Sequence, residues 1–347
     1  MKKKIYSIII VVMLLMTTGC GSNNYIKDDD NKIVQYKETG QNLQKNILCK
    51  PEENSELYKL YESYDKELKI SLKKLPTCEN FKVNSNKSSG IWEFLFVKPL
   101  AYLILKLGSL VGNMGVSLII VGLLIRIILF PFSYKTHKQS KNMQKVQRDI
   151  QKLELKYRGR TDQESMMLKS QEMMAIYKKY NVKPMGGCLI AFLQLPIFFA
   201  FLEAINRVPA IFEGSLLGFN LGMTPYVGLS KGNYFYIILI ILIALSTYFS
   251  FKYSMSATAN TGNSEMKNQM NMMTNIMTIV IIITSFSLST ALSFYWIVTY
   301  AFIAVQTFIF KRLTNEKKDK PDKSDKNKKR LIKDKLEEKR GLKYGNN

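Results

Sequence analysis

One apolar stretch, Gly115–Ser133 (GVSLIIVGLLIRIILFPFS), constrains the fold of this chain more than any other segment. As an α-helix it rises about 28 Å, close to the hydrocarbon thickness of a bilayer. Its one charged residue is Arg126, which lies about 14 Å along the helix from the next basic residue, Lys135. A snorkelling arginine reaches only about half of that distance, so its head group should stay below the interface. We interpret Arg126 as a charge held in a water-filled cavity. The alternative is a helix end at which Arg126 touches lipid head groups.

The rest of the chain alternates long uncharged apolar runs with basic polar stretches, a pattern typical of a polytopic membrane protein. The 347 residues carry a net charge of +23. We therefore expect an all-α membrane protein with five transmembrane helices and with connecting segments oriented by the positive-inside rule. The five predicted spans lie at about residues 115–133, 188–205, 234–251, 270–286 and 292–310.

Enzyme chemistry is not indicated by the sequence. The motifs G-x-x-x-x-G-K-[ST] and H-E-x-x-H are absent, which argues against ATP hydrolysis and zinc proteolysis. His137 is the single histidine, so no metal site is expected. Two binding functions remain: a carrier or channel for a small anion that uses Arg126, and a device that handles polypeptide.

The N-terminus resembles a bacterial lipoprotein signal peptide, Met1–Gly19. Three lysines precede the apolar run Ile5–Met16, which is too short for a comfortable membrane span. A glycine then precedes Cys20, as in a lipobox, although Thr17 stands where leucine is usual. We expect cleavage before Cys20 and a covalent lipid such as diacylglycerol and palmitate on this residue, with no other cofactor. An uncleaved membrane anchor is the alternative.

Residues 20–90 are predicted to form an extracytoplasmic segment. Apolar residues recur at three and four residue intervals over Ser55–Lys74, which predicts a helix. Cys49 and Cys78 flank it and could form a disulfide outside the cytoplasm. A straight helix would hold its ends about 30 Å apart, so a bridge requires a bend, which we place near Ser63–Asp65. Two free thiols are the alternative.

Ile91–Leu107 is apolar but contains charged residues and a proline. A span here would place the following basic segment outside the cell, against the positive-inside rule. We therefore predict an amphipathic helix on the outer surface, ended by Gly108 and Gly112.

The segment Tyr134–Lys183 holds thirteen Lys and Arg against five Asp and Glu, which places it in the cytoplasm. Apolar residues at coiled-coil spacing predict a helical hairpin that stands off the membrane. Thr161 and Glu164 are a predicted capping box for its second arm. The two predicted seams consist of Met143, Val146, Ile150, Leu153 and Tyr157, and of Met166, Met173, Tyr177 and Tyr180.

The C-terminal tail, residues 313–347, is basic and almost devoid of apolar residues. This composition is typical of a disordered segment. Together with the hairpin, it is suited to bind ribosomal RNA or anionic lipid.

Four segments carry a family resemblance: LLIRIILFPF around Arg126, Tyr177–Cys188 (YKKYNVKPMGGC), Gln194–Ala200 (QLPIFFA) and Ser293–Val298 (SFYWIV). Together they resemble the YidC/Oxa/Alb membrane protein insertases, over roughly Ile91–Arg312. The lipobox in front resembles the Gram-positive branch. The resemblance implies a five-span core with a hydrophilic groove that is closed to the outside and open to cytoplasm and lipid.

The resemblance also implies roles for individual residues. Arg126 would be the groove cation, Gln194, Leu195 and Pro196 would belong to an apolar slide for the substrate, and Trp296 would face the groove. The function implied is insertion and folding of nascent membrane proteins, with assistance to lipoproteins, alone or with the Sec translocon. The location implied is the bacterial plasma membrane, with the lipidated N-terminus outside and the C-terminus in the cytoplasm.

The sequence departs from the family pattern at several positions. Ile190 and Thr278 stand where proline is common, and Leu288–Ala291 replaces a Phe-Pro-Ala-Gly turn. Ser250 lies near a position often occupied by glutamine. We therefore do not predict which polar side chains accompany Arg126 in the groove.

Overall fold

The computed structural model describes residues 24–86, 90–180, 188–259 and 264–316. The signal peptide, Cys20 and residues 317–347 of the tail lie outside the described residues. The chain divides into two compact units, Met1–Ala304 and Val305–Asn347. The larger unit contains every element except the last part of helix α12.

The described chain begins with a small N-terminal domain, residues 24–86, which has its own apolar core around Ile26, Leu43, Leu57 and Tyr61. Its elements are the antiparallel strands β1 (Gln35–Tyr36) and β2 (Gln41–Asn42), helix α2 (Glu56–Ser63) and the 3₁₀ turns η2 (Asp65–Glu67) and η3 (Leu72–Lys74). The single helix predicted over Ser55–Lys74 is therefore wrong beyond its first half.

The chain turns after α2 because side chains replace helical hydrogen bonds there. Ser55 caps the start of α2 by accepting from the Tyr58 amide. At the other end, the Asp65 carboxylate accepts from the Leu72 amide at 2.6 Å and from the Ser71 hydroxyl at 2.8 Å. Short acidic side chains that bind local backbone donors compete with the helix in this way. The bend expected near Ser63–Asp65 is present, and a disulfide joins Cys49 to Cys78 across a Cα–Cα distance of 4.9 Å.

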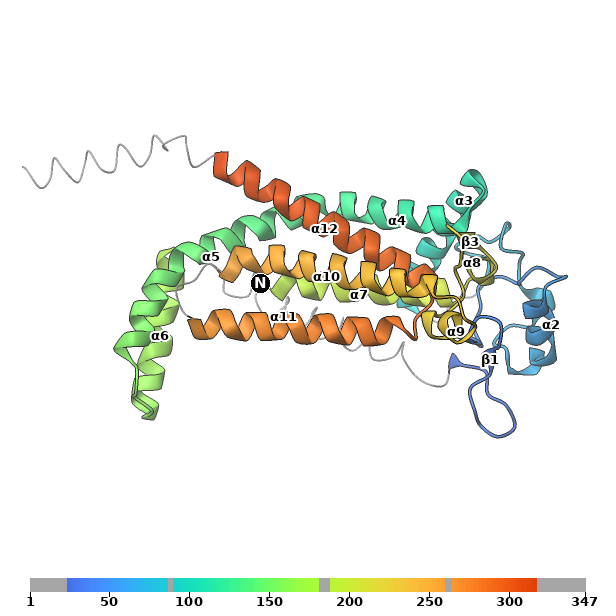
Figure 1. Cartoon of the computed structure of the whole chain (residues 1–347), viewed down its shortest axis with the longest axis horizontal. Helices are drawn as coiled ribbons and strands as arrows, with labels where there is room; N and C mark the ends of the chain where they lie inside the picture. Colours follow the sequence, from blue (N-terminus) through green and yellow to red (C-terminus); the bar gives the residue numbers. More distant parts are fainter. Residues whose placement is uncertain (1–23, 87–89, 181–187, 260–263, 317–347) are drawn as a thin grey trace, which may run out of the picture. The chain divides into compact units, whose positions relative to one another are not determined.

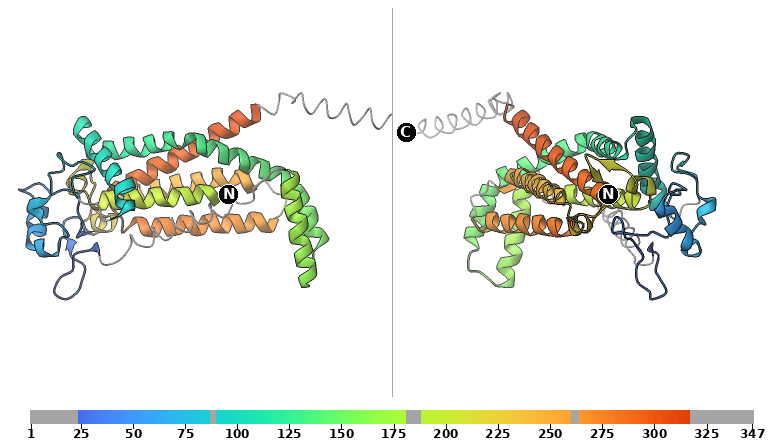
Figure 2. Two further views of the ribbon diagram at one scale, coloured as in Figure 1. Left: turned by 180° about the vertical axis from the view of Figure 1, so that it is seen from behind. Right: turned by 45° about the vertical axis from the view of Figure 1, so that its right-hand side comes forward.

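A π-helical turn, η4 (Glu93–Val97), leads into helix α3 (Lys98–Val111). The prediction that Gly108 ends this helix is wrong. The helix continues to Gly112, which adopts a left-handed conformation with φ 70°, a conformation open to glycine at helix ends. Gly108 instead allows close packing, since a Cβ there would lie 2.3 Å from Met114 Sδ. Helix α3 runs across the end of the helix bundle, steeply inclined to α4 (Figures 1 and 2).

The apolar stretch that contains Arg126 is not one straight helix. It forms α4 (Met114–Ile128) and the start of α5 (Phe130–Lys156), with a bend of 52° between them. Pro131 lies in the first turn of α5. Proline lacks an N–H and its ring clashes with the carbonyl four residues earlier, so an α-helix does not pass straight through it.

Helix α5 contacts α6 (Gln163–Lys179), and the two helices occupy the segment for which a hairpin is predicted. Val146 and Ile150 are buried against Ile176, Tyr177 and Tyr180.

Two details of the predicted hairpin are wrong. The N-cap of α6 is Asp162, which accepts from the Ser165 amide at 2.8 Å, and not Thr161. Met166 is 57% exposed and does not take part in the seam.

The remaining helices are α7 (Cys188–Asn206), α8 (Pro209–Phe212), α9 (Pro225–Ser230), α10 (Phe235–Ala259), α11 (Ser264–Ser285) and α12 (Thr290–Glu316). A short antiparallel pair, β3 (Ser215–Leu216) and β4 (Phe219–Asn220), lies between α8 and α9. Helices α4, α7, α10 and α11 run side by side (Figures 1 and 2). The described chain is thus mostly helical, with two small strand pairs that the sequence did not predict.

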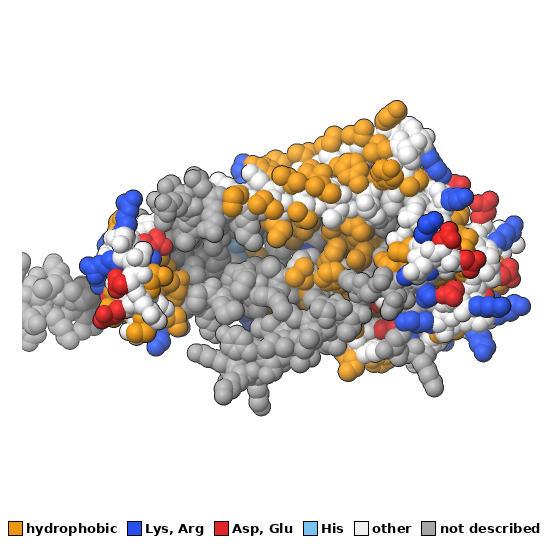
Figure 3. Space-filling view, turned by 90° about the horizontal axis from the view of Figure 1, so that it is seen from below, with side chains coloured by type: hydrophobic (Ala, Val, Ile, Leu, Met, Phe, Trp, Pro, Cys, Tyr) orange, Lys and Arg blue, Asp and Glu red, His pale blue; other side chains and the backbone are white. Residues whose placement is uncertain are grey.

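Among the described residues, three helices are long and apolar enough to cross a membrane: Glu93–Val111, Phe235–Tyr253 and Thr290–Arg312. The bent pair Met114–Ile128 and Phe130–His137 raises the number to four. Two shorter apolar helices are Gln194–Asn206 and Thr274–Ser285. Figure 3 shows charged side chains gathered over the N-terminal domain and the hairpin, while hydrophobic side chains dominate the described surface between them. This distribution is typical of a membrane protein.

Candidate functional site

The guanidinium of Arg126 lies inside the helix bundle. The residue is only 9% exposed, and its Nη2 atom is buried without a hydrogen-bond partner among the described residues. Its neighbours are the phenols of Tyr295 and Tyr300 in the N-terminal half of α12. The Tyr295 hydroxyl also interacts with Gln194 of α7 and Thr299. The structure therefore brings Arg126 and Gln194 together through Tyr295, a residue that sequence reasoning did not single out.

A glycine on α4 allows this arrangement. Gly122 lies one turn before Arg126 and packs against Tyr295, where an added Cβ would be 3.3 Å from Tyr295 Cδ2. That separation is tighter than an ordinary van der Waals contact. The close approach of α4 and α12 thus places the guanidinium and the phenol on facing helices.

Two aromatic stacks join α7 to α12. Phe201 stacks on Tyr295 with ring centroids 4.1 Å apart, and Phe198 stacks on Trp296 at 5.5 Å. Aromatic pairs favour offset or tilted packing, and they stabilise the fold by more than the burial of their apolar area alone. Trp296 is buried in this stack.

The three residues expected on the apolar slide differ in their exposure. Leu195 is 46% exposed, whereas Gln194 and Pro196 are half-buried. Leu195 is therefore the most accessible of the three residues.

Further buried hydroxyl groups lie on α10, α11 and α12. They belong to Thr247 and Ser250 of α10, Thr274 and Thr278 of α11, and Thr299 of α12. The Thr278 hydroxyl donates to the Thr274 carbonyl at 2.9 Å. The Thr247 hydroxyl has no hydrogen-bond partner among the described residues. Buried polar atoms are usually satisfied by protein or water, so unpaired ones indicate water in this interior.

Metal chemistry has no support in the part of the chain that the structure describes, where no cluster of His, Cys, Asp and Glu could hold an ion. The polar interior instead offers one cation, several hydroxyls and apolar walls. Such a surface can attract a charged segment of polypeptide without changing it chemically.

Comparison with known proteins decides between the two binding functions. Residues 106–318 match the family described as 60Kd inner membrane protein. The chain belongs to this family.

Relatives of this chain match its sequence over most of their own length. Membrane protein insertase MisCA of Bacillus subtilis (strain 168) is 37% identical over 238 residues, which cover 68% of this chain and 85% of the relative. Membrane protein insertase YidC 2 of Bacillus anthracis is 37% identical over 227 residues, 65% of this chain and 83% of the relative. Membrane protein insertase YidC of Oceanobacillus iheyensis is 35% identical over 233 residues, 67% of this chain and 88% of the relative.

The family membership confirms the resemblance drawn from the four sequence segments. This family consists of membrane protein insertases and not of enzymes. The function of the chain is therefore membrane protein insertion, and its substrates are nascent membrane proteins. The match begins at residue 106, within α3, so the N-terminal domain lies outside it.

Proposed function

We propose that the chain inserts and folds nascent membrane proteins through a water-filled groove whose fixed charge is Arg126. The single observation that carries this mechanism is the buried guanidinium with an unpaired nitrogen beside the phenols of Tyr295 and Tyr300, in a bundle that also buries hydroxyls on α10 and α11. An arginine is retained inside a membrane bundle at a cost of a few kcal/mol only where water or a partner offsets that cost. The groove supplies the water.

The proposed mechanism is electrostatic. A groove that wets part of the bilayer shortens the apolar path that the polar flank of a substrate must cross. Arg126 attracts acidic residues in that flank. Two unit charges about 4 Å apart attract by roughly 1 kcal/mol in water and 4 kcal/mol at the effective dielectric near a protein surface. The exposed Leu195 and its apolar neighbours on α7 guide the hydrophobic segment.

The proposed topology has five spans, formed by α4 with the start of α5, α7, α10, α11 and α12. The N-terminal domain then lies outside and the hairpin in the cytoplasm, in a bacterial plasma membrane. The disulfide supports this orientation, because disulfides persist outside the reducing cytoplasm. Helix α3, which runs across the end of the bundle, is proposed as the amphipathic helix at the outer surface.

Further proposals concern the ends of the chain and its partners. Cys20 carries the lipid anchor, and the basic tail with the hairpin binds ribosomal RNA or anionic head groups. The insertase acts alone or with the Sec translocon and assists lipoproteins. The basic composition of the tail and the hairpin supports the proposed binding of ribosomal RNA or anionic head groups.

The mechanism is tested by reconstituting Arg126 variants with two single-span reporters that differ only in the charge of the translocated tail. Because Arg126 acts through its charge, Arg126→Lys should keep most of the insertion activity. Arg126→Ala should lower insertion of the acidic reporter roughly tenfold or more and that of the neutral reporter least. Equal losses for both reporters would remove the electrostatic role. A specific anion site would be damaged by lysine almost as much as by alanine, with anion flux as its readout.

A further inference from the structure

A buried ion cluster lies where the N-terminal domain meets the helices. Arg207, directly after α7, places Nη2 3.2 Å from Glu93 Oε2 and Nη1 2.9 Å from Glu203 Oε1. The ammonium of Lys98 lies 3.7 Å from Glu93 Oε1. Trp92 Nε1 donates to Glu203 at 3.0 Å. Arg207 is 3% exposed and Lys98 is fully buried. Burial of such ions is costly unless the remaining donors also find acceptors.

The N-terminal domain supplies those acceptors from its backbone. Arg207 Nε donates to the Asn46 carbonyl at 2.7 Å, and the Arg207 carbonyl accepts from the Leu48 amide at 2.8 Å. Lys98 Nζ donates to the Asn86 carbonyl. Both buried cations are therefore completed by a domain that lies outside the family match. Loss of that domain would leave them with unsatisfied donors.

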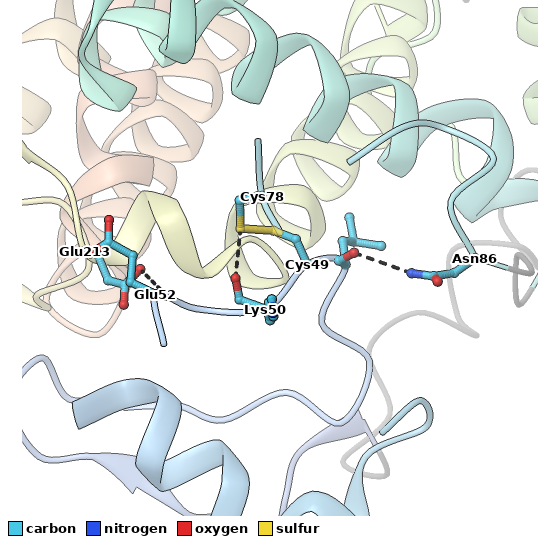
Figure 4. The surroundings of a disulfide bond; sticks show 7 residues. Cys49, Lys50, Glu52, Cys78, Asn86 and Glu213 are labelled. Atoms are coloured by element: carbon cyan, nitrogen blue, oxygen red, sulfur yellow. Dashed lines mark hydrogen bonds between the residues drawn. A yellow bond between two sulfur atoms is a disulfide. The ribbon is translucent and has the colours of Figure 1, made fainter. Parts of the chain in front are cut away.

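The disulfide lies directly beside these contacts. Cys49 follows Leu48 in sequence and is fully buried, and Figure 4 shows its bond to Cys78 close to the helices. Leu48, Cys49 and Phe81 pack in the same apolar cluster as Ala204 and other residues of the helix bundle. The bridge thus fixes the segment that holds Arg207.

We propose that the disulfide-bonded N-terminal domain is a clamp that seals its end of the helix bundle, with Arg207 as the positioning residue. The clamp holds η4 and α3 against the end of α7, and the buried charges make its docking specific. The clamp thereby limits the access of water to the bundle from this end. This role goes beyond the insertase function and does not depend on it.

The clamp is tested with Ala204→Cys as a probe in the full-length protein in lipid nanodiscs, in a Cys188→Ser background. Ala204 is fully buried in the shared cluster, so a water-soluble maleimide should react slowly. Removal of the bridge by Cys49→Ser with Cys78→Ser should accelerate labelling by up to about a hundredfold, because the bridge closes a long loop. Arg207→Gln should also accelerate labelling. Arg207→Lys should give an intermediate rate, since lysine keeps the positive charge but cannot donate to several acceptors at once as the planar guanidinium does.

The control probe is Ser250→Cys, which is buried in the second half of α10, away from the docked domain. Its labelling rate should be the same in all variants. Unchanged labelling of Ala204→Cys would overturn the clamp, and equal acceleration at both probes would reduce Arg207 to a general role in folding.

Hydrogen exchange provides a measurement without a probe. In Arg207→Gln, exchange should rise at the Leu48 amide while α2, with its buried Tyr61, stays protected. Protection retained at Leu48 would also contradict the proposal.

Discussion

At the scale of single residues, the site depends on Gly122 as much as on Arg126. A Cβ at Gly122 would press on the ring of Tyr295 at 3.3 Å, which Tyr295 can accommodate by a small shift. Gly122→Ala should therefore be tolerated. Gly122→Leu should separate α4 from α12 and lower stability by about 1–3 kcal/mol, the usual cost of overpacking. Thermal unfolding of the purified variants measures this difference. Equal stability of both variants would show that the two helices do not pack closely at this point.

The residues of the site differ in how far sequence predicts them. Arg126 is conspicuous because a charge inside an apolar run has an energetic cost. Tyr295 and Thr299 could not be found this way, since hydroxyl-bearing residues are common in apolar helices and their role depends on which helix faces them. Thr247 and Ser250 stand three residues apart on α10, a spacing that does signal one helix face. That signal becomes specific only once Arg126 is known to face a shared interior.

At the scale of elements, the hairpin is held by hydrogen bonds to two carboxylates. The Tyr180 hydroxyl donates to Asp149 at 2.8 Å and lowers the pKa of that carboxyl. Lys156 donates to Glu172 at 2.6 Å and lowers the pKa of that carboxyl as well. A carboxyl with a lowered pKa stabilises the fold above its ordinary pKa of about 4, and this contribution is lost as pH falls further.

Hairpin stability should therefore fall on acidification below pH about 4, measured by hydrogen exchange of α5 and α6 in the full chain. Tyr180→Phe should flatten this dependence, because Asp149 then returns toward its ordinary pKa. Tyr177→Phe is the matched control on the same helix face, since the pKa of Asp149 does not depend on it. A steep acid transition that survives in Tyr180→Phe would contradict the assignment.

The helices themselves follow from sequence, but their breaks do not. Apolar residues at coiled-coil spacing predicted helices on both sides of Arg158–Arg160, and the uncharged apolar run Tyr234–Phe251 predicted α10, which begins at Phe235 but continues to Ala259. The bend at Leu129, the end of α2 and the cap at Asp162 depend on single side chains, namely Pro131, Asp65 and Asp162. Each of these side chains changes the local stability by about one to a few kcal/mol. A single residue of this kind does not alter the apolar pattern of a long segment.

At the scale of the whole molecule, the N-terminal domain docks through contacts between residues far apart in sequence, which a single sequence does not reveal. Glu213, after α8, is one such contact. Its Oε1 atom is buried without a partner among the described residues, and Oε2 accepts weakly from the Glu52 amide at 3.5 Å (Figure 4). Burial, the largest effect, raises the pKa of Glu213.

A raised carboxyl pKa means that, as pH rises, the folded state keeps its proton at pH values at which the unfolded state has already lost it. Docking should thus be strongest below the ordinary glutamate pKa of about 4.3 and should weaken as pH rises through the higher pKa of the folded state. Glu213→Gln keeps the shape, removes the charge and should strengthen docking at neutral pH. Slower hydrogen exchange at the Glu52 and Leu48 amides would show it. Glu53→Gln is the contrasting variant, because the hydrogen bond from Lys50 lowers the pKa of Glu53 and its loss should not strengthen docking. Faster exchange in Glu213→Gln at neutral pH would mean that the ionised carboxylate holds the domain in place.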